Sequence, residues 1–153
     1  MFKKKILFFC LFFMLIGCGY SPLYKNLSDI DFKINLKNIS GDRDLNNFVK
    51  SNINQYVNKK SAKIFEININ SKYEKITVSR SVTGTATNYE LRGTISFDVS
   101  SEDISRKIVL KESVTIKKME NIFDEESYEK NVKQNFANSI TRRLFLMLTQ
   151  IKW

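Results

Sequence analysis

Histidine is absent from this 153-residue sequence. Its absence removes the most common general base, the Ser-His-Asp triad and the most common metal ligand at once. No carboxylate pair stands out in its place, because Glu125 and Glu126 are neighbours on an expected helix and face different directions. We therefore expect a protein without catalytic residues, a metal site or a cofactor. A small hydrolase that uses carboxylates is kept as one alternative.

Cysteine is nearly absent, with Cys10 and Cys18 as its only examples. Cys10 lies in an unbroken apolar run, 6–16, which follows three lysines and is shorter than the roughly 20 residues that a membrane-spanning helix needs. The run ends in Leu15-Ile16-Gly17-Cys18, which resembles the bacterial lipobox, where the cysteine is acylated and the chain is cut just before it. We therefore expect 1–17 to be a cleaved signal peptide and Cys18 to carry a lipid. The alternative is an uncleaved membrane anchor with an incidental cysteine.

Acidic residues are outnumbered, with 16 Asp and Glu against 25 Lys and Arg. Residues 1–17 hold three of the lysines and no acid, so removal of the signal lowers the net charge from +9 to +6. Because an exported chain rarely meets nucleic acid, we expect the target to be a phosphate-rich envelope molecule or a negatively charged partner surface. The alternative is that the positive charge is mostly solvated surface.

Alternation of apolar and polar residues predicts several strands, the strongest of them at 89–99. Glu112 conflicts with the alternation in the last strand, because it occupies an apolar position. We expect a bulge near Glu112-Ser113 that turns this carboxylate outward. The segments with a period of two are 30–36, 65–69, 76–82, 89–99 and 108–116.

Two segments have apolar residues at helical spacing. One is 45–57, and the other is a long C-terminal stretch that opens at Asp124-Glu125-Glu126. Acidic residues suit the first turn of a helix because they complement its dipole. In the long stretch Tyr128 and Met147 belong to the apolar stripe, and 144–148 is apolar nearly all round. Such an end is usually deeply buried or docked on another surface.

These elements predict an α+β fold built as a two-layer sandwich. We expect about four mostly antiparallel strands with two helices on one face, in the order β-α-β-β-β-α, and a second sheet face that is polar. Residues 18–28, which contain the only proline, are expected to form a lipidated tether. Residues 29–153 are then expected to form a single domain.

Four short motifs follow one another along the chain. Directly after the signal comes Cys18-Gly19-Tyr20-Ser21-Pro22-Leu23-Tyr24, and Gly41-Asp42-Arg43 precedes the first helix. Thr83-Gly84-Thr85-Ala86-Thr87-Asn88-Tyr89-Glu90-Leu91 enters the strongest strand, and Ser139-Ile140-Thr141-Arg142-Arg143-Leu144 lies in the last helix. In their order and spacing these motifs resemble the family of LPS-assembly lipoproteins called LptE. The resemblance spans the whole mature chain.

The resemblance implies a function in lipopolysaccharide transport. LptE-like lipoproteins sit inside the LptD β-barrel, help it to assemble, and together with it insert lipopolysaccharide into the outer leaflet. The implied partners are an LptD-type barrel, lipopolysaccharide and the membrane through the lipid anchor, but no nucleic acid. Gly19 stands where an aspartate would retain a lipoprotein at the inner membrane, which favours an outer-membrane protein that faces the periplasm and fills the barrel lumen. The alternative is a structural envelope lipoprotein that scaffolds another membrane complex without binding lipopolysaccharide.

Basic residues on the polar strand faces are the candidates for contact with lipopolysaccharide. Lipid A phosphates favour several cations spaced along a surface, and arginine can bind them bidentately. The alternative is that these are ordinary solvated residues or edge charges that prevent aggregation. No motif of the family assigns this contact to particular positions. The candidates are Arg92 on the strongest strand and Lys107, Lys111 and Lys117 on the last strand.

Overall fold

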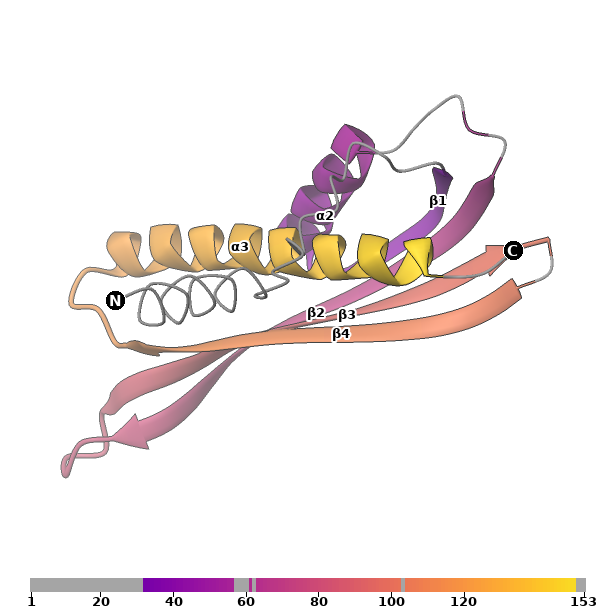
Figure 1. The fold of residues 1–153 in the computed structure, drawn as a ribbon. Coiled ribbons are helices and arrows are strands. Elements are labelled where there is room, and N and C mark those ends of the chain that lie inside the picture. The colour runs from indigo at the N-terminus through magenta and orange to yellow at the C-terminus, as the bar shows by residue number, and fades with distance from the viewer. Residues whose placement is uncertain (1–31, 57–60, 62, 103, 151–153) are drawn as a thin grey trace, which may run out of the picture.

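The computed structural model describes residues 32–56, 61, 63–102 and 104–150. The expected signal peptide 1–17, the tether 18–28 and the lipid site Cys18 lie outside these residues. The described elements, in chain order, are β1 (Lys33–Gly41), α2 (Arg43–Tyr56), β2 (Ile64–Arg80), β3 (Ala86–Ser101), β4 (Ile104–Lys117) and α3 (Ile122–Thr149) (Figure 1). The predicted α+β class and the order β-α-β-β-β-α are therefore confirmed.

The four strands form one sheet in the order β1-β2-β3-β4. β1 pairs with β2 in parallel, across the connection that contains α2, whereas β2–β3 and β3–β4 are antiparallel. Figure 1 shows both helices on the same side of the sheet, with α3 lying lengthwise along it. The opposite face of the sheet, called the open face from here on, is not covered by any described element.

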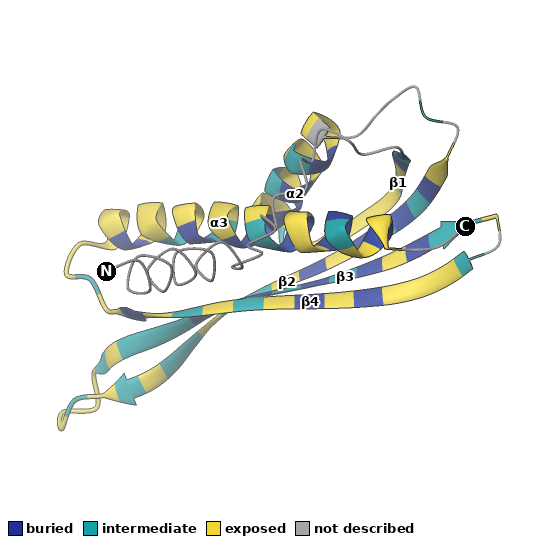
Figure 2. Cartoon of the chain, viewed as in Figure 1, coloured by how far each residue is buried: buried dark blue, intermediate teal, exposed yellow. Residues whose placement is uncertain are grey.

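The core lies between the helices and the sheet, and Figure 2 shows its buried residues alternating along the strands. Alternation places every second side chain of a strand on one face, and apolar burial of that face is the main stabilising term of such a sandwich. The largest fully buried side chains are Leu45, Val49, Ile53, Phe65, Ile67, Leu91, Ile95, Phe97, Ile140, Leu144, Phe145 and Leu148.

The segments 65–69 and 76–82 are not separate strands, as the sequence suggested, because β2 continues through both. Lys75 pairs with Leu91 and therefore lies on the helix-covered face, while Ile76 lies on the open face. Val78 falls at an irregularity of the register and is half exposed. Pairing with β3 keeps β2 continuous through the polar residues that separate its two apolar groups.

The expected bulge at Glu112-Ser113 is wrong. The register between β3 and β4 has no shift, and Glu112 sits directly opposite Gly93 on the helix-covered face. Its carboxylate accepts hydrogen bonds from Ser139 Oγ at 2.7 Å and Arg143 Nη1 at 2.9 Å, both on α3. Because α3 satisfies the carboxylate, the strand does not need to turn it outward.

α3 begins two residues before the expected acidic turn, because the Asn121 side chain caps it by accepting from the Phe123 N–H at 2.9 Å. Tyr128 and Met147 do not belong to the buried stripe, since each remains 40% exposed. Leu144 and Leu148 are buried as expected. Among the described residues, no helix is both long and apolar enough to cross a membrane.

Candidate functional site

The open face carries all four cations singled out from the sequence. In β3, buried Leu91 and Ile95 point to the helices, so Arg92, between them, points the other way. The register then places three lysines of β4 on the same face, each opposite a polar residue of β3. The pairs are Lys107 with Asp98, Lys111 with Thr94, and Lys117 with Asn88.

Two of these cations are engaged by acids of β3. Arg92 donates to both carboxylate oxygens of Glu90, from Nη2 at 2.9 Å and from Nε at 3.3 Å. Lys107 Nζ lies 4.0 Å from Asp98 Oδ1. In the described part of the chain, neither Lys111 nor Lys117 forms an ion pair within 4.0 Å. Of the four candidates, these two lysines are therefore the most available to an anionic ligand.

A further carboxylate on β2 moderates the positive field of the open face. The hydrogen bond from Lys72 is the main cause that lowers the pKa of Glu74 below its ordinary value, and the nearby charges of Arg92 and Lys111 lower it further. Sequence reasoning missed this group, because only strand pairing brings Glu74 opposite Arg92. The open face thus carries charges of both signs. Its edge along β4 holds Lys107, Lys111 and Lys117, and this row is called the cationic margin from here on.

The cationic margin also contains an apolar residue that sequence reasoning missed. Val109 is 48% exposed and lies between Lys107 and Lys111 on the same face. At about 3.4 Å of rise per residue, the two lysines stand roughly 14 Å apart along the strand, and Lys117 lies roughly 20 Å beyond Lys111. The alternation could have identified Val109, because it is an apolar residue at one of the polar positions of the strand.

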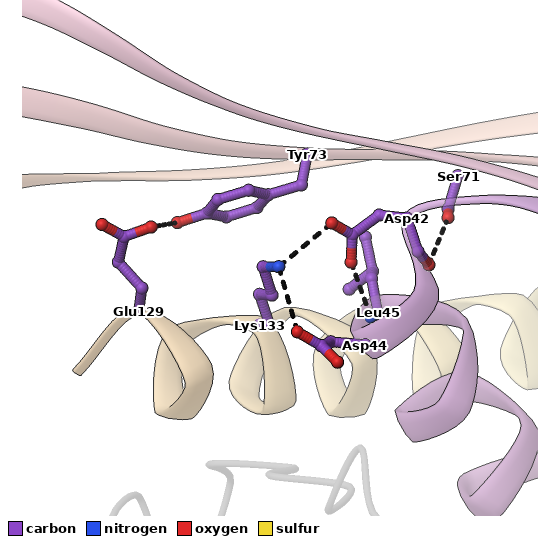
Figure 3. A network of polar contacts seen from close by, with 7 residues as sticks. All are labelled: Asp42, Asp44, Leu45, Ser71, Tyr73, Glu129 and Lys133. Carbon is purple, nitrogen blue, oxygen red and sulfur yellow. Dashed lines mark hydrogen bonds and ion pairs between the residues drawn. The ribbon is translucent and has the colours of Figure 1, made fainter. Parts of the chain in front are cut away.

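The helix-covered face holds a polar network between α3, β2 and the start of α2 (Figure 3). Lys133 of α3 donates to Asp42 at 3.0 Å and to Asp44 at 3.4 Å, and its ammonium lies 4.4 Å from the centre of the Tyr73 ring. The Tyr73 hydroxyl donates to Glu129 at 3.0 Å. Burial, followed by the Glu129 charge, raises the pKa of Tyr73 well above its ordinary value.

Lys75 extends this network towards the N-terminus of α3. It bridges Glu125 and Glu129, and its ammonium lies 4.5 Å from the centre of the Tyr89 ring. The Lys75 hydrogen bond is the main cause that lowers the pKa of Glu125, and the Met119 N–H, which Glu125 accepts at 2.9 Å, adds to it. Every carboxylate here has a cationic or N–H partner from another part of the fold. The network therefore fastens α3 to β2.

Comparisons with known proteins find the fold but no sequence relative. No protein-family model matches the chain, and no curated protein sequence matches it. Rare lipoprotein B from Shewanella oneidensis is similar in structure, with a TM-score of 0.57 and 14% identity, over 75% of this chain and 97% of that one. The chain shares the fold of this lipoprotein.

Two other solved structures match less closely. The minor lipoprotein from Acinetobacter baumannii has a TM-score of 0.48 and 17% identity, over 72% of this chain and 93% of that one. Lipoprotein B from Nitrosomonas europaea has a TM-score of 0.48 and 16% identity, over 77% and 88% of the respective chains.

One other feature of the described residues, a surface depression, does not coincide with the four cations. A depression of about 360 Å³ is lined by Ile64, Glu66, Ser100, Ser101 and Glu102, near the other end of β4 from Lys117. Glu66 is paired there with Lys37 at 2.8 Å. No group of three or more Cys, Asp or Glu side chains in the described part of the chain is arranged to hold a metal ion.

Proposed function

We propose that this protein is an outer-membrane lipoprotein, anchored through Cys18, that binds inside an LptD-type β-barrel and helps it to assemble. It acts by binding rather than by catalysis, and supports the transport of lipopolysaccharide into the outer leaflet. The observation that carries the proposal is the fold that the chain shares with rare lipoprotein B, which it matches over 97% of that protein's length. The lipobox-like Leu15-Ile16-Gly17-Cys18 adds the expected lipid anchor.

The anchor and the domain have separate roles in this proposal. Each buried CH₂ of an acyl chain contributes about 0.8 kcal/mol to membrane binding, so two or more chains on Cys18 hold the protein firmly. The domain then has to fit a barrel lumen, whose inward-facing residues can be polar and line a wide interior. The helix-covered face of the sheet is buried in the core, so we expect the open face to contact the lumen.

The cationic margin of β4 supports contact with lipopolysaccharide. Phosphate oxygens form short, charge-assisted hydrogen bonds with ammonium and guanidinium groups. Lys111 and Lys117 can bind such a ligand without competition from a paired acid, whereas Glu90 and Asp98 compete with it for Arg92 and Lys107. Val109 offers an apolar contact between the cations, which suits an amphipathic glycolipid.

Recovery of the protein from native outer membranes tests the proposed partner. The lipidated chain is purified in mild detergent, and the proteins that come with it are identified and quantified. We expect a large β-barrel in equal molar amount, and we expect it to stay bound in high salt, because burial inside a lumen is not mainly electrostatic. Recovery of the chain alone, or with unrelated envelope proteins, contradicts the barrel role.

Charge variants test contact with lipopolysaccharide. We expect the double substitution Lys111→Gln and Lys117→Gln to weaken binding to lipopolysaccharide vesicles, by roughly two- to fivefold for each lysine at low salt. The matched control is Lys50→Gln with Lys130→Gln, which removes two exposed cations from the helices instead. Equal binding by both double variants means that only net charge matters and contradicts a site on β4.

A structural envelope lipoprotein without lipopolysaccharide binding is the alternative function. The contacts of Arg92 with Glu90 and of Lys107 with Asp98 favour it, because paired charges suit a protein surface better than a phosphate. Recovery of a different membrane complex, together with no difference between the two double variants, supports this alternative.

A further inference from the structure

β4 is a long and regular edge strand. It lies at the end of the strand order and, among the described residues, pairs only with β3. It runs for 14 residues without a proline, and its register with β3 has no shift. Natural proteins usually protect such an edge with a bulge, a proline, a covering element or charged side chains, because its outward backbone groups can pair with another chain. Of these devices, β4 has the charged side chains.

The hydrogen-bond phase of β4 identifies the backbone groups that are free. The Lys118 N–H donates to the Thr87 carbonyl at 2.8 Å, just after the end of the strand. Because bonded residues alternate along an antiparallel strand, the even-numbered residues of β4 bond to β3 and the odd-numbered ones direct N–H and C=O outward. The Lys111 carbonyl agrees with this phase, since Arg143 Nη1 donates to it at 3.3 Å from outside the sheet, and it is therefore an outward group that is already engaged.

The same odd-numbered residues carry the cations of the open face. Outward backbone groups and positive side chains therefore coincide on one edge, and none of the odd-numbered residues of β4 is acidic. Glu112, the acid within β4, faces α3 and is bound by Ser139 and Arg143. The outward residues are Ser105, Lys107, Val109, Lys111, Ser113, Thr115 and Lys117.

We propose that the edge of β4 binds an acidic, extended segment of a partner protein, which adds to the sheet as an antiparallel fifth strand. Strand addition satisfies the outward N–H and C=O groups, and the charge of the edge selects an acidic segment. A second copy of the chain is a poor occupant, because two β4 edges would bring together two rows of lysines with no outward acid between them, and like charges across a strand pair destabilise a sheet.

The register of β4 defines the pattern that the segment needs. Residues directly opposite each other on one face have Cβ atoms about 5 Å apart. Acidic residues are therefore expected opposite Lys107 and Lys111, four positions apart, with a β-branched residue between them opposite Val109. This inference goes beyond the proposed function, because it requires neither the Cys18 lipid nor a barrel. Either proposal can fail while the other holds.

A synthetic peptide with N-methylated controls tests strand addition. The probe is Glu-Thr-Val-Thr-Glu-Thr-Val-Thr-Glu, acetylated and amidated, and the target is the full chain in mild detergent at low salt. With glutamates opposite Lys107 and Lys111 and a valine opposite Val109, the glutamate and valine N–H groups point at the strand and the threonine N–H groups point away. We expect N-methylation of the glutamates to weaken binding by at least about tenfold, and N-methylation of the threonines to change it far less.

Variants of the chain supply a second measurement. Val109→Pro removes an outward N–H without removing a bond to β3, and proline is accepted in edge strands at such positions, so we expect a folded protein that no longer binds the peptide. Lys107→Glu with Lys111→Glu leaves the backbone intact, and we expect it to weaken peptide binding by at least about tenfold. Lys130→Glu on the outer side of α3 is the charge control and should bind normally.

Three outcomes overturn the inference. One is the absence of peptide binding to the unchanged protein at low salt. Another is equal weakening by both N-methylation patterns, which assigns any binding to charge alone. The third is binding of anionic phospholipid vesicles without binding of the peptide, which assigns the edge cations to a lipid surface. Loss of binding confined to the glutamate-methylated peptide and the β4 variants supports it.

Discussion

Gly41 and Gly84 both have positive φ angles, of +102° and +81°, but they differ in their surroundings. A Cβ on Gly41 would lie 1.8 Å from the Ser71 carbonyl oxygen, where β1 ends against β2, whereas a Cβ on Gly84 would meet nothing within 4 Å. The close contact at Gly41 brings Asp42 to the N-terminus of α2. There the Asp42 N–H donates to Ser71 at 3.2 Å, and its carboxylate accepts from the Leu45 N–H at 2.9 Å.

This contrast predicts different costs for the same substitution. We expect Gly84→Ala to lower the free energy of unfolding by about 1–2 kcal/mol, the usual cost of a positive φ in a residue with a Cβ. Gly41→Ala adds a backbone clash, and we expect a loss of at least about 3 kcal/mol. Urea unfolding followed by circular dichroism measures both. Equal losses would mean that β1 and β2 can separate at Gly41 without cost.

At the scale of elements, α3 is held to the sheet by two kinds of contact. Its C-terminal half is held mainly by apolar burial, with Ile140, Leu144 and Leu148 at 1% exposure or less, and the contacts of Ser139 and Arg143 with Glu112 add a smaller polar part. The N-terminal half of α3 is held mainly by polar contacts, through Glu125, Glu129 and Lys133. Charged partners respond to pH and apolar partners do not, so the two halves of α3 should differ in their stability towards acid.

Glu125 determines the direction of this response. Its pKa is lowered in the folded protein, first by the Lys75 hydrogen bond and then by the Met119 N–H. Its contribution to stability is therefore complete above the pKa of an unfolded glutamate, about 4.3, and is lost as the pH falls through the lower folded pKa. We expect hydrogen exchange in the first turns of α3 to accelerate below about pH 4 while the C-terminal half remains protected.

A substitution at Glu125 separates this contact from general acid effects. We expect Glu125→Gln to cost about 1–2 kcal/mol at neutral pH, because Lys75 loses a charged partner, and to flatten the acid limb of stability against pH. The control is Glu126→Gln, at the exposed neighbouring residue. It should leave both the stability at neutral pH and the acid limb nearly unchanged. An unchanged acid limb in Glu125→Gln would mean that the contact does not hold α3.

At the scale of the whole molecule, the predicted position of the protein in the cell rests on residues outside the described fold. The lipobox-like motif predicts a lipid on Cys18, whereas the alternative is an uncleaved anchor. The two possibilities differ in the mass and the first residue of the membrane-bound chain. Both leave the α+β domain the same.

Serine substitutions at the two cysteines distinguish these possibilities. We expect the unchanged protein to begin at Cys18 with a lipid mass, and Cys18→Ser to retain residues 1–17 and incorporate no labelled fatty acid. Cys10→Ser is the matched control and should be processed normally, because Cys10 lies in the apolar run rather than at the cut. Intact mass spectrometry of membrane fractions gives the processed mass of all three proteins, and the retained label reports the fatty acid. Retention of 1–17 in the unchanged protein contradicts the signal-peptide prediction.

Much of the fold could be predicted because its signals are local. Alternation along 89–99 and the apolar stripe of 45–57 depend only on neighbouring residues, and they correctly predicted β3 and most of α2. The apolar residues at helical spacing in the long C-terminal stretch also predicted α3. These features are settled by backbone geometry and burial of one face, whatever the rest of the chain does.

The errors and omissions come from contacts between distant residues. Glu112 was expected to turn outward because its partners, Ser139 and Arg143, lie 27 and 31 residues away. The register of β2 places Lys75 on the helix-covered face, and the distant Glu125 and Glu129 satisfy its charge there. A prediction from the apolar pattern places such a polar residue wrongly, because the pattern does not include the distant partner that satisfies its hydrogen bonds.

The candidate site shows the same division. Alternation alone determined that Arg92, Lys107, Lys111 and Lys117 avoid the apolar face. The contact of Arg92 with Glu90 is also local, because the two residues are neighbours on one face of β3. Only the tertiary structure decided that Asp98 lies opposite Lys107 and that β4 forms an edge with outward backbone groups. Side-chain direction follows from the geometry of one strand, whereas charge pairing between strands and edge position depend on which strands lie beside it.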